Sequence, residues 1–252
     1  MNKAIIFASY IPTKEQIYIG LEFLDLFRDL YEDYDIYVGV NPSCQEWLDM
    51  LNQRGINYNI TPDNLIVNSD VSAYQSALSL LKKSNKKYDL YTFAHTKGVT
   101  SNAHTFRAEV FERFLGKKFV IEKLFEQNQE IGLYSPWVTT CSTKNSIQKS
   151  LDVFLGDSEC KNTDTMTQYT FYTIRGCIIN DFIENVKPIF WGSKITDVSY
   201  PYYDHKIVGN QIIWDYKSEI GSSQFKNDIY FFERDFPMIA ERKCFKITNK
   251  LN

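Results

Sequence analysis

The sequence predicts an α/β protein with a mostly parallel central sheet flanked by helices. Strand-like and helix-like segments alternate through the first hundred residues. Apolar residues make up 44% of the 252-residue chain, which is enough material for a core on both faces of a sheet. Strand–helix–strand units close with right-handed crossovers and build doubly wound, Rossmann-like sheets.

The first half of the chain carries the clearer pattern. Phe23, Phe27 and Leu30 recur at three- and four-residue spacing, which is typical of an amphipathic helix. Ser43 is a candidate N-cap for a short helix that ends before Gly55. The predicted elements are strands at 4–10, 35–40 and 90–94, extended segments at 56–60 and 64–67, and helices at 15–31, 44–54 and 70–87.

The second half is less regular. A long helical pattern with a break near Gly116 precedes a short apolar strand. No repeat, low-complexity tract or linker divides the chain, so we expect one domain over residues 1–252. The predicted elements are helices at 106–127, 180–186 and 225–241, strands at 131–134 and 171–175, helix plus loop at 141–167, and an irregular lid or loop at 197–221.

Composition excludes several classes of function. A net charge of -3 with interspersed signs argues against nucleic-acid binding, which needs a basic excess. The apolar run at 4–10 is too short for a transmembrane helix, and no cleavage site follows it, so a cytoplasmic protein is expected. Five widely spaced cysteines and three histidines favour reduced thiols over a disulfide framework, and disfavour a structural zinc site.

Ligands of parallel sheets bind beyond the carboxyl ends of the strands. The strand at 90–94 delivers His95, Thr96 and Lys97 to that edge, followed by Gly98. A lysine there can neutralise a diphosphate, while threonine and main-chain N–H groups complete the cradle. The alternative is a loop with a hydrogen-bonded histidine and a solvated lysine.

Several segments in order resemble one known family. The run Y-D-L-Y-T-F-A-H-T-K-G at 88–98 is followed by Phe106-Arg107, by I-G-L-Y-S-P at 131–136, by T-F-Y-T-I-R-G at 170–176 and by F-F-E-R-D-F-P at 231–237. In patches over residues 4–240, the chain resembles the rhamnan-synthesis protein F family and related bacterial and viral glycosyltransferases.

The resemblance implies a GT-A-like fold and a nucleotide-sugar donor. It implies transfer of a hexosyl or deoxyhexosyl group from a UDP- or dTDP-linked donor to an acceptor hydroxyl of a glycan or glycoconjugate. Residues 1–100 would form the nucleotide-sugar-binding half and residues 101–252 the acceptor-side half. The donor-binding residues would be Ser9, Tyr10, Asp70, His95, Thr96 and Lys97.

Some of these residues have structural alternatives. Asp is a favoured helix N-cap, so Asp70 is as readily explained by capping the helix that follows it. Tyr10 is as readily explained by surface packing.

Glu233 is the candidate general base. An inverting transfer needs a carboxylate that takes the proton from the acceptor hydroxyl. Glu233 stands between Phe232 and Arg234, and a structural pair with the arginine is the alternative. Asp204 and Asp215 are rival bases.

The metal requirement stays open at the level of sequence. Many GT-A enzymes hold Mn²⁺ or Mg²⁺ through a D-x-D motif, where the metal neutralises the departing diphosphate. Asp33 and Asp35 have that spacing but precede a strand, at the wrong edge of the sheet. Either Lys97 with a nearby arginine neutralises the diphosphate, or less regular ligands such as Asp70 and His95 hold a metal.

Two other classes remain for comparison. A non-catalytic nucleotide- or sugar-binding module would share the fold and lack only the base. A dinucleotide-dependent enzyme is disfavoured, because residues 9–14 after the first strand contain no glycine.

Overall fold

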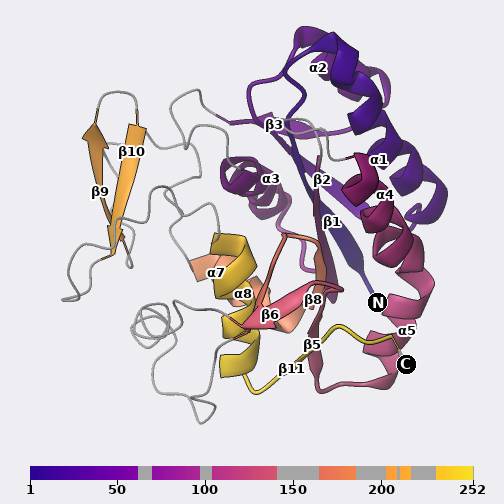
Figure 1. Cartoon of the computed structure of the whole chain (residues 1–252), viewed down its shortest axis with the longest axis vertical. Helices are drawn as coiled ribbons and strands as arrows, with labels where there is room; N and C mark the ends of the chain where they lie inside the picture. The colour runs from indigo at the N-terminus through magenta and orange to yellow at the C-terminus, as the bar shows by residue number, and fades with distance from the viewer. Residues whose placement is uncertain are drawn as a thin grey trace.

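The fold is described from a computed structural model, in which residues 1–61, 70–96, 104–140, 165–185, 203–208, 211–216 and 231–251 are described. Seven strands form a central sheet in the order β11-β5-β8-β4-β1-β2-β3 (Figure 1). They are β1 (Lys3–Ser9), β2 (Asp35–Val40), β3 (Tyr58–Ile60), β4 (Leu90–His95), β5 (Ile131–Tyr134), β8 (Tyr172–Arg175) and β11 (Lys246–Thr248).

The sheet is mixed. β8 pairs antiparallel with β4 and with β5, whereas β1 pairs parallel with β2 and with β4, β2 with β3, and β11 with β5. The predicted α/β class with a helix-flanked central sheet is therefore confirmed. The prediction gave no direction to the strand at 171–175, because an apolar pattern carries no information about direction.

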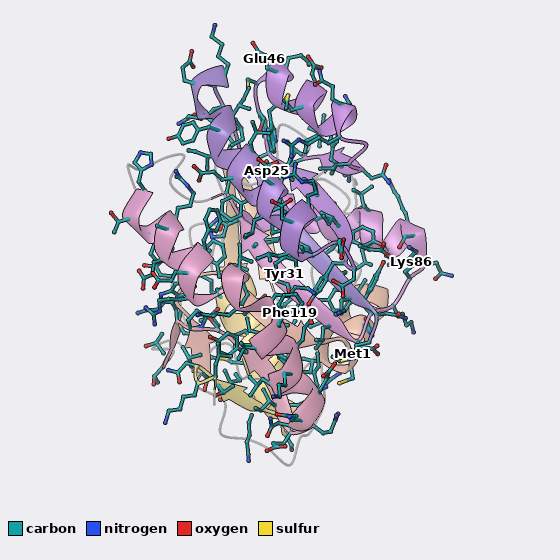
Figure 2. All side chains as sticks on the ribbon, turned by 90° about the vertical axis from the view of Figure 1, so that its right-hand side faces the viewer. Met1, Asp25, Tyr31, Glu46, Lys86 and Phe119 are labelled. Carbon is teal, nitrogen blue, oxygen red and sulfur yellow. The ribbon has the colours of Figure 1, made fainter. Side chains whose placement is uncertain are left out.

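Helices cover both faces of the sheet, as Figure 1 shows. One face packs against α3 (Asp70–Ser84), α7 (Gly176–Asn185) and α8 (Phe231–Arg242). The other packs against α1 (Ile17–Leu30), α2 (Gln45–Gln53), α4 (His104–Arg113) and α5 (Lys118–Gln127), the side seen in Figure 2. Short 3₁₀ turns, η1 (Lys14–Gln16) and η2 (Leu115–Lys117), precede α1 and α5.

The alternation of side chains along β1 explains the two cores. Ala4, Ile6 and Ala8 belong to the core beneath α3, α7 and α8, whereas Ile5 and Phe7 belong to the core beneath α1 and α4. A strand buried on both faces needs apolar residues at every position, which is why residues 4–8 are a continuous apolar run.

Gly39 on β2 allows α3 to approach the sheet closely. A Cβ atom at this position would lie 1.6 Å from the carbonyl oxygen of Ala73. Any side chain here would push away the first turn of α3, which begins at Asp70. Gly39 therefore sets the distance of Asp70 from the carboxyl end of the sheet.

Several predicted details are wrong. Ser43 does not cap α2: the N-cap is Cys44, and the Ser43 hydroxyl accepts the Ile11 N–H at 2.9 Å and donates to Asn41. The part of the predicted 141–167 helix-and-loop region that is described forms β7 (Thr165–Thr167), paired with β6 (Val138–Thr140). The expected irregular lid contains a regular hairpin of β9 (Tyr203–Val208) and β10 (Gln211–Tyr216).

Other expectations have mixed outcomes. The break near Gly116 is confirmed, because η2 separates α4 from α5. Cys44 and Cys177 are free thiols, but Cys244 is disulfide-bonded, so the expectation of reduced cysteines is wrong for Cys244. Across the described ranges, no helix combines the length and apolar character needed to cross a membrane. The predicted extended segment at 64–67 lies outside the described residues.

Candidate carboxyl-edge site

The carboxyl ends of six strands meet at one edge of the sheet. This follows from the parallel pairing within β4-β1-β2-β3 and within β11-β5, with antiparallel β8 joining the two groups. Because β8 runs in the opposite direction, its first residues also lie at this edge. The edge therefore gathers side chains from the ends of β1 and β4 and from the segment that enters β8.

Asp70 and His95 meet at this edge. Asp70 is the first residue of α3, and His95 is the last residue of β4. His95 Nδ1 lies 3.4 Å from Asp70 Oδ2, and the His95 side chain is 8% exposed, whereas that of Asp70 is 40% exposed. The contact brings together two residues that the sequence assigns to donor binding, and the carboxylate gives the imidazole ring a preferred orientation.

Two aromatic rings pack against the His95 imidazole. Phe171 stacks on the imidazole with ring centroids 4.4 Å apart and an interplanar angle of 24°. Tyr74 meets the same ring edge-on, at a centroid distance of 6.4 Å. The Tyr74 hydroxyl donates a hydrogen bond to the Thr170 carbonyl at 3.0 Å. His95 is thus held by contacts from α3 and from the segment before β8.

Glu233 lies in the first turn of α8 and is buried, with 8% of its surface exposed. The Thr167 hydroxyl donates to its main-chain carbonyl at 3.4 Å. Burial raises the pKa of Tyr74 well above its usual value of 10.0, and the charges of Asp70 and Glu233 raise it further. Glu233 therefore lies within electrostatic range of the tyrosine that contacts His95.

The ends of β1 and β4 are joined by Thr96. Its hydroxyl accepts the Tyr10 N–H at 3.0 Å, and its own N–H donates to the Ala8 carbonyl at 3.0 Å. Ser9 is 1% exposed, and alternation along β1 directs its side chain to the face opposite His95. Its hydroxyl is buried without a hydrogen-bond partner among the described residues.

The structure therefore brings together Ser9, Tyr10, Asp70, His95 and Thr96 at one edge, and Glu233 lies within electrostatic range of Tyr74, which packs against His95. Lys97, predicted to bind the donor, lies outside the described residues. The rival bases Asp204 and Asp215 are register partners across the β9–β10 hairpin, which is a separate sheet.

The described side chains do not form a ready metal site. Within the part of the chain that the structure describes, no group of three or more His, Cys, Asp or Glu residues is placed to hold an ion. Asp70 and His95 alone would be two ligands, fewer than Mn²⁺ or Mg²⁺ takes from its surroundings. The donor set of the described residues does not fit a resident metal.

Tyr74, Thr170 and Phe171 contribute to this edge but were missed as site residues. The sequence predicts only that Tyr74 lies in the helix at 70–87 and Phe171 in the strand at 171–175. One signal was available for Tyr74: it follows Asp70 by four residues, so the two share a face of α3. The stacking of Phe171 on His95 joins positions far apart in sequence, which no local pattern reports.

Arg107 lies beside this edge, in the first turn of α4, and its charge is already paired. Its Nε donates to Glu22 at 2.6 Å, and one terminal nitrogen lies 3.1 Å from His104 Nδ1. The guanidinium also packs over the Tyr18 ring at 5.6 Å. Arg107, 5% exposed, joins α4 to α1 and is not presented to a ligand.

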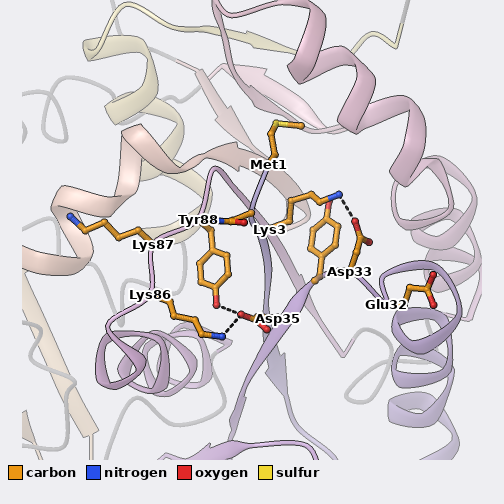
Figure 3. Close-up of a pocket in the computed structure, with 10 residues that line it drawn as sticks. Met1, Lys3, Glu32, Asp33, Asp35, Lys86, Lys87 and Tyr88 are labelled. Carbon is orange, nitrogen blue, oxygen red and sulfur yellow. Dashed lines mark hydrogen bonds and ion pairs between the residues drawn. The ribbon is translucent and has the colours of Figure 1, made fainter.

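A pocket of about 450 Å³ lies at the opposite, amino edge of the sheet (Figure 3). Asp33 and Asp35 line it, as the sequence predicts for a D-x-D spacing that precedes a strand. Lys86 pairs with Asp35 at 2.7 Å, and the Tyr88 hydroxyl donates to the same carboxylate. Asp33 is held by Lys3 and Lys118. These carboxylates are neutralised by neighbours.

Fold and geometry define an α/β protein whose candidate site lies at the carboxyl edge of its central sheet. A comparison with known families matches residues 17–186 to rhamnan synthesis protein F. The match covers more than half of the chain, which therefore belongs to that family, and the family is involved in making a polysaccharide. Comparisons with curated proteins and with solved structures found no match.

Proposed function

We propose that the chain is a GT-A-like glycosyltransferase that uses the carboxyl edge as its active site. It transfers a sugar from a UDP- or dTDP-linked donor to an acceptor hydroxyl of a glycan or glycoconjugate. Membership of a polysaccharide-synthesis family supports the reaction class. The choice of nucleotide and the GT-A architecture rest on the resemblance of the sequence segments.

One observation carries the proposal. Asp70 at the start of α3 and His95 at the end of β4 meet at 3.4 Å, and Tyr74, which packs edge-on against His95, lies within electrostatic range of buried Glu233 on α8. Chemically versatile side chains from separate elements meeting at the ligand-binding edge of an α/β sheet are typical of an active site. The network of paired charges around the amino-edge pocket lacks this character.

The donor occupies the ends of β1 and β4 in this proposal. Tyr10, Asp70, His95 and Thr96 bind the nucleotide sugar, and Lys97 stabilises the negative charge of the departing diphosphate. Ser9 takes part mainly through the main chain, because its side chain is buried. Inhibition by a chelator, compared with the effect of Lys97→Ala, separates a metal from the lysine as the source of positive charge.

Glu233 acts as the general base on the acceptor side. Removal of the hydroxyl proton makes the acceptor oxygen a better nucleophile as it attacks the anomeric carbon. Burial of Glu233 in the first turn of α8 suits this role, because a side chain held by its surroundings presents its carboxylate in a defined direction. An attack from the face opposite the diphosphate inverts the configuration of the sugar.

Thermal denaturation with a panel of nucleotide sugars tests the proposal. A donor at about 100 times its dissociation constant stabilises the fold by about 2.7 kcal/mol, or about 5–10 °C in Tm for a domain of this size. UDP- or dTDP-sugars should raise Tm, and the free sugars serve as the control. Absence of any shift at millimolar concentration would contradict the proposal. Binding without transfer to any acceptor would favour the non-catalytic module.

A further inference from the structure

We propose that Tyr74 is a positioning residue for His95: its hydroxyl ties α3 to the segment before β8 and so fixes the imidazole at the carboxyl edge. The inference rests on the proposed function, in which His95 contacts the donor. It assigns a role to a side chain that neither the sequence pattern nor the family description singles out.

The contacts around Tyr74 form a closed cycle that leads from residue to residue and back to α3. Asp70 lies one helical turn before Tyr74 on α3 and contacts His95 at 3.4 Å. The imidazole stacks on Phe171 at 4.4 Å. Thr170 precedes Phe171, and its carbonyl accepts the hydrogen bond from Tyr74 at 3.0 Å. This cycle of contacts therefore starts at Asp70 and ends at Tyr74, one helical turn apart on α3.

Each contact in this cycle restricts one motion of the His95 side chain. Asp70 fixes the direction of Nδ1, and Phe171 fixes the plane of the imidazole. Asp70 lies on α3 and Phe171 on the segment before β8. The Tyr74 hydrogen bond joins these two segments and so holds Asp70 and Phe171 at a constant separation. Without that bond, both supports remain but lose the link between Tyr74 and Thr170.

Tyr74 is suited to a fixed role as a donor. Its side chain is fully buried, and burial together with the charges of Asp70, Tyr172 and Glu233 keeps the pKa of its hydroxyl well above the usual value. The hydroxyl therefore stays protonated at any physiological pH. The protonated hydroxyl is able to donate the hydrogen bond to the Thr170 carbonyl at 3.0 Å.

The chain contains a matched control on the other face of the sheet. Tyr31, 2% exposed, donates a hydrogen bond from its hydroxyl to the Leu115 carbonyl at 2.8 Å. It lies at the C-cap of α1, beside α5 (Figure 2). Tyr31→Phe and Tyr74→Phe thus remove the same chemical group from the same kind of contact, but only Tyr74 adjoins His95.

The experiment compares the two variants in stability and in kinetics. Both should lower Tm by a similar amount, about 2–4 °C, because each loses one buried hydrogen bond. Tyr74→Phe should lower kcat about tenfold while the donor KM changes less than about threefold, since small misplacement of a reacting group slows turnover more than it weakens binding. Tyr31→Phe should leave kcat unchanged within about twofold.

NMR of the histidine rings provides a readout that needs no activity. The chain has only three histidines, His95, His104 and His205, so their ring signals are resolvable. The stacked Phe171 should displace the His95 ring protons from their ordinary shifts. Tyr74→Phe should move these signals back toward ordinary values, whereas Tyr31→Phe should leave them in place.

Two results would overturn the inference. One is an unchanged His95 spectrum in Tyr74→Phe, and the other is an equal loss of kcat in both tyrosine variants. If Tyr74→Phe does not fold, Phe171→Leu removes the stacked ring directly and should give the same spectral change and the same loss of kcat. A wild-type protein that transfers no sugar would refute the proposed function, while the NMR comparison would still test the positioning.

Discussion

The two edges of the central sheet carry polar side chains in different states of pairing. At the amino edge, Lys118 contacts Asp33 at 2.8 Å and Glu122 at 3.1 Å, and Lys3 contacts the same two carboxylates. At the carboxyl edge, the Asp70–His95 contact is longer, at 3.4 Å. Lysine–carboxylate pairs stabilise the fold, whereas at the carboxyl edge the carboxylate faces a histidine.

The amino-edge pocket is lined by Lys3, Asp33, Asp35 and Lys86, whose charges are mutually neutralised (Figure 3). Substitutions at the amino edge should therefore change stability without changing activity. Substitutions at the carboxyl edge should lower activity by more than their small effect on stability explains.

The largest loss of stability is expected for Arg175→Met. Arg175, at the end of β8, donates from Nε to the Ile131 carbonyl at 2.7 Å, and from a terminal nitrogen to the carbonyls of Phe125 and Asn128. These bonds terminate α5 and join it to β5. Their loss leaves buried carbonyls unpaired, at a cost of about 3–5 kcal/mol.

Chemical denaturation measures this effect. Arg113→Met, on the exposed side of α4, is the control and should cost less than about 1 kcal/mol. The folded fraction of Arg175→Met should retain wild-type specific activity, because the residue lies at the amino edge. A selective loss of activity in that folded fraction would contradict the division between the two edges.

The next effect in size is expected for His95→Gln. The amide preserves a hydrogen-bonding group but not the stacked imidazole ring, so kcat/KM should fall about 10²-fold, or about 2.7 kcal/mol. Stability should fall by less than about 1.5 kcal/mol. Steady-state kinetics and thermal denaturation measure the two quantities. His104→Gln, on the exposed start of α4, should have wild-type kinetics, and equal losses in both variants would argue against a role for His95.

The smallest expected effect is a pH dependence of the free energy of unfolding that arises from Asp33. Partial burial acts to raise the pKa of Asp33, but Lys118 and Lys3 outweigh burial and lower it to about 2. A depressed pKa stabilises the fold above the unfolded value near 4 and loses this contribution as the pH falls from about 4 to 2. Because the side chain is 45% exposed, the contribution is about 1 kcal/mol or less.

Asp33→Asn tests this dependence. The variant should be less stable than wild type at pH 7, and the difference should disappear near pH 2. Asp49→Asn, on the exposed side of α2, is the control. A difference between wild type and Asp33→Asn that stays constant from pH 7 to pH 2 would contradict the account.

Local patterns predicted the elements that bury a clear apolar stripe or run. The strand at 35–40 is β2 with the same bounds, and the helix at 15–31 is η1 followed by α1. Patterns failed where the structure depends on partners distant in sequence. β11 and β6 have only three residues each, and pairing with β5 and β7 defines them. The direction of β8 is likewise a property of its neighbours.

The candidate site was predictable only in part for the same reason. His95 and Asp70 stood out because each adjoins a strand end or helix start, where ligands of α/β proteins bind. Tyr74 and Phe171 did not stand out, because an aromatic residue in an apolar pattern is usually core. Only the folded chain shows that these two rings are both core residues and supports of a polar group.

The most direct test of the carboxyl edge as an active site is the transfer rate of Glu233→Gln. A general base acts in the transition state, so its loss should lower kcat by at least about 10²-fold while the dissociation constant of the donor changes less than about threefold. Glu241→Gln is the control, because Glu241 lies at the other end of α8, where its carboxylate accepts a hydrogen bond from the Thr165 N–H. Near-normal transfer by Glu233→Gln would contradict the account.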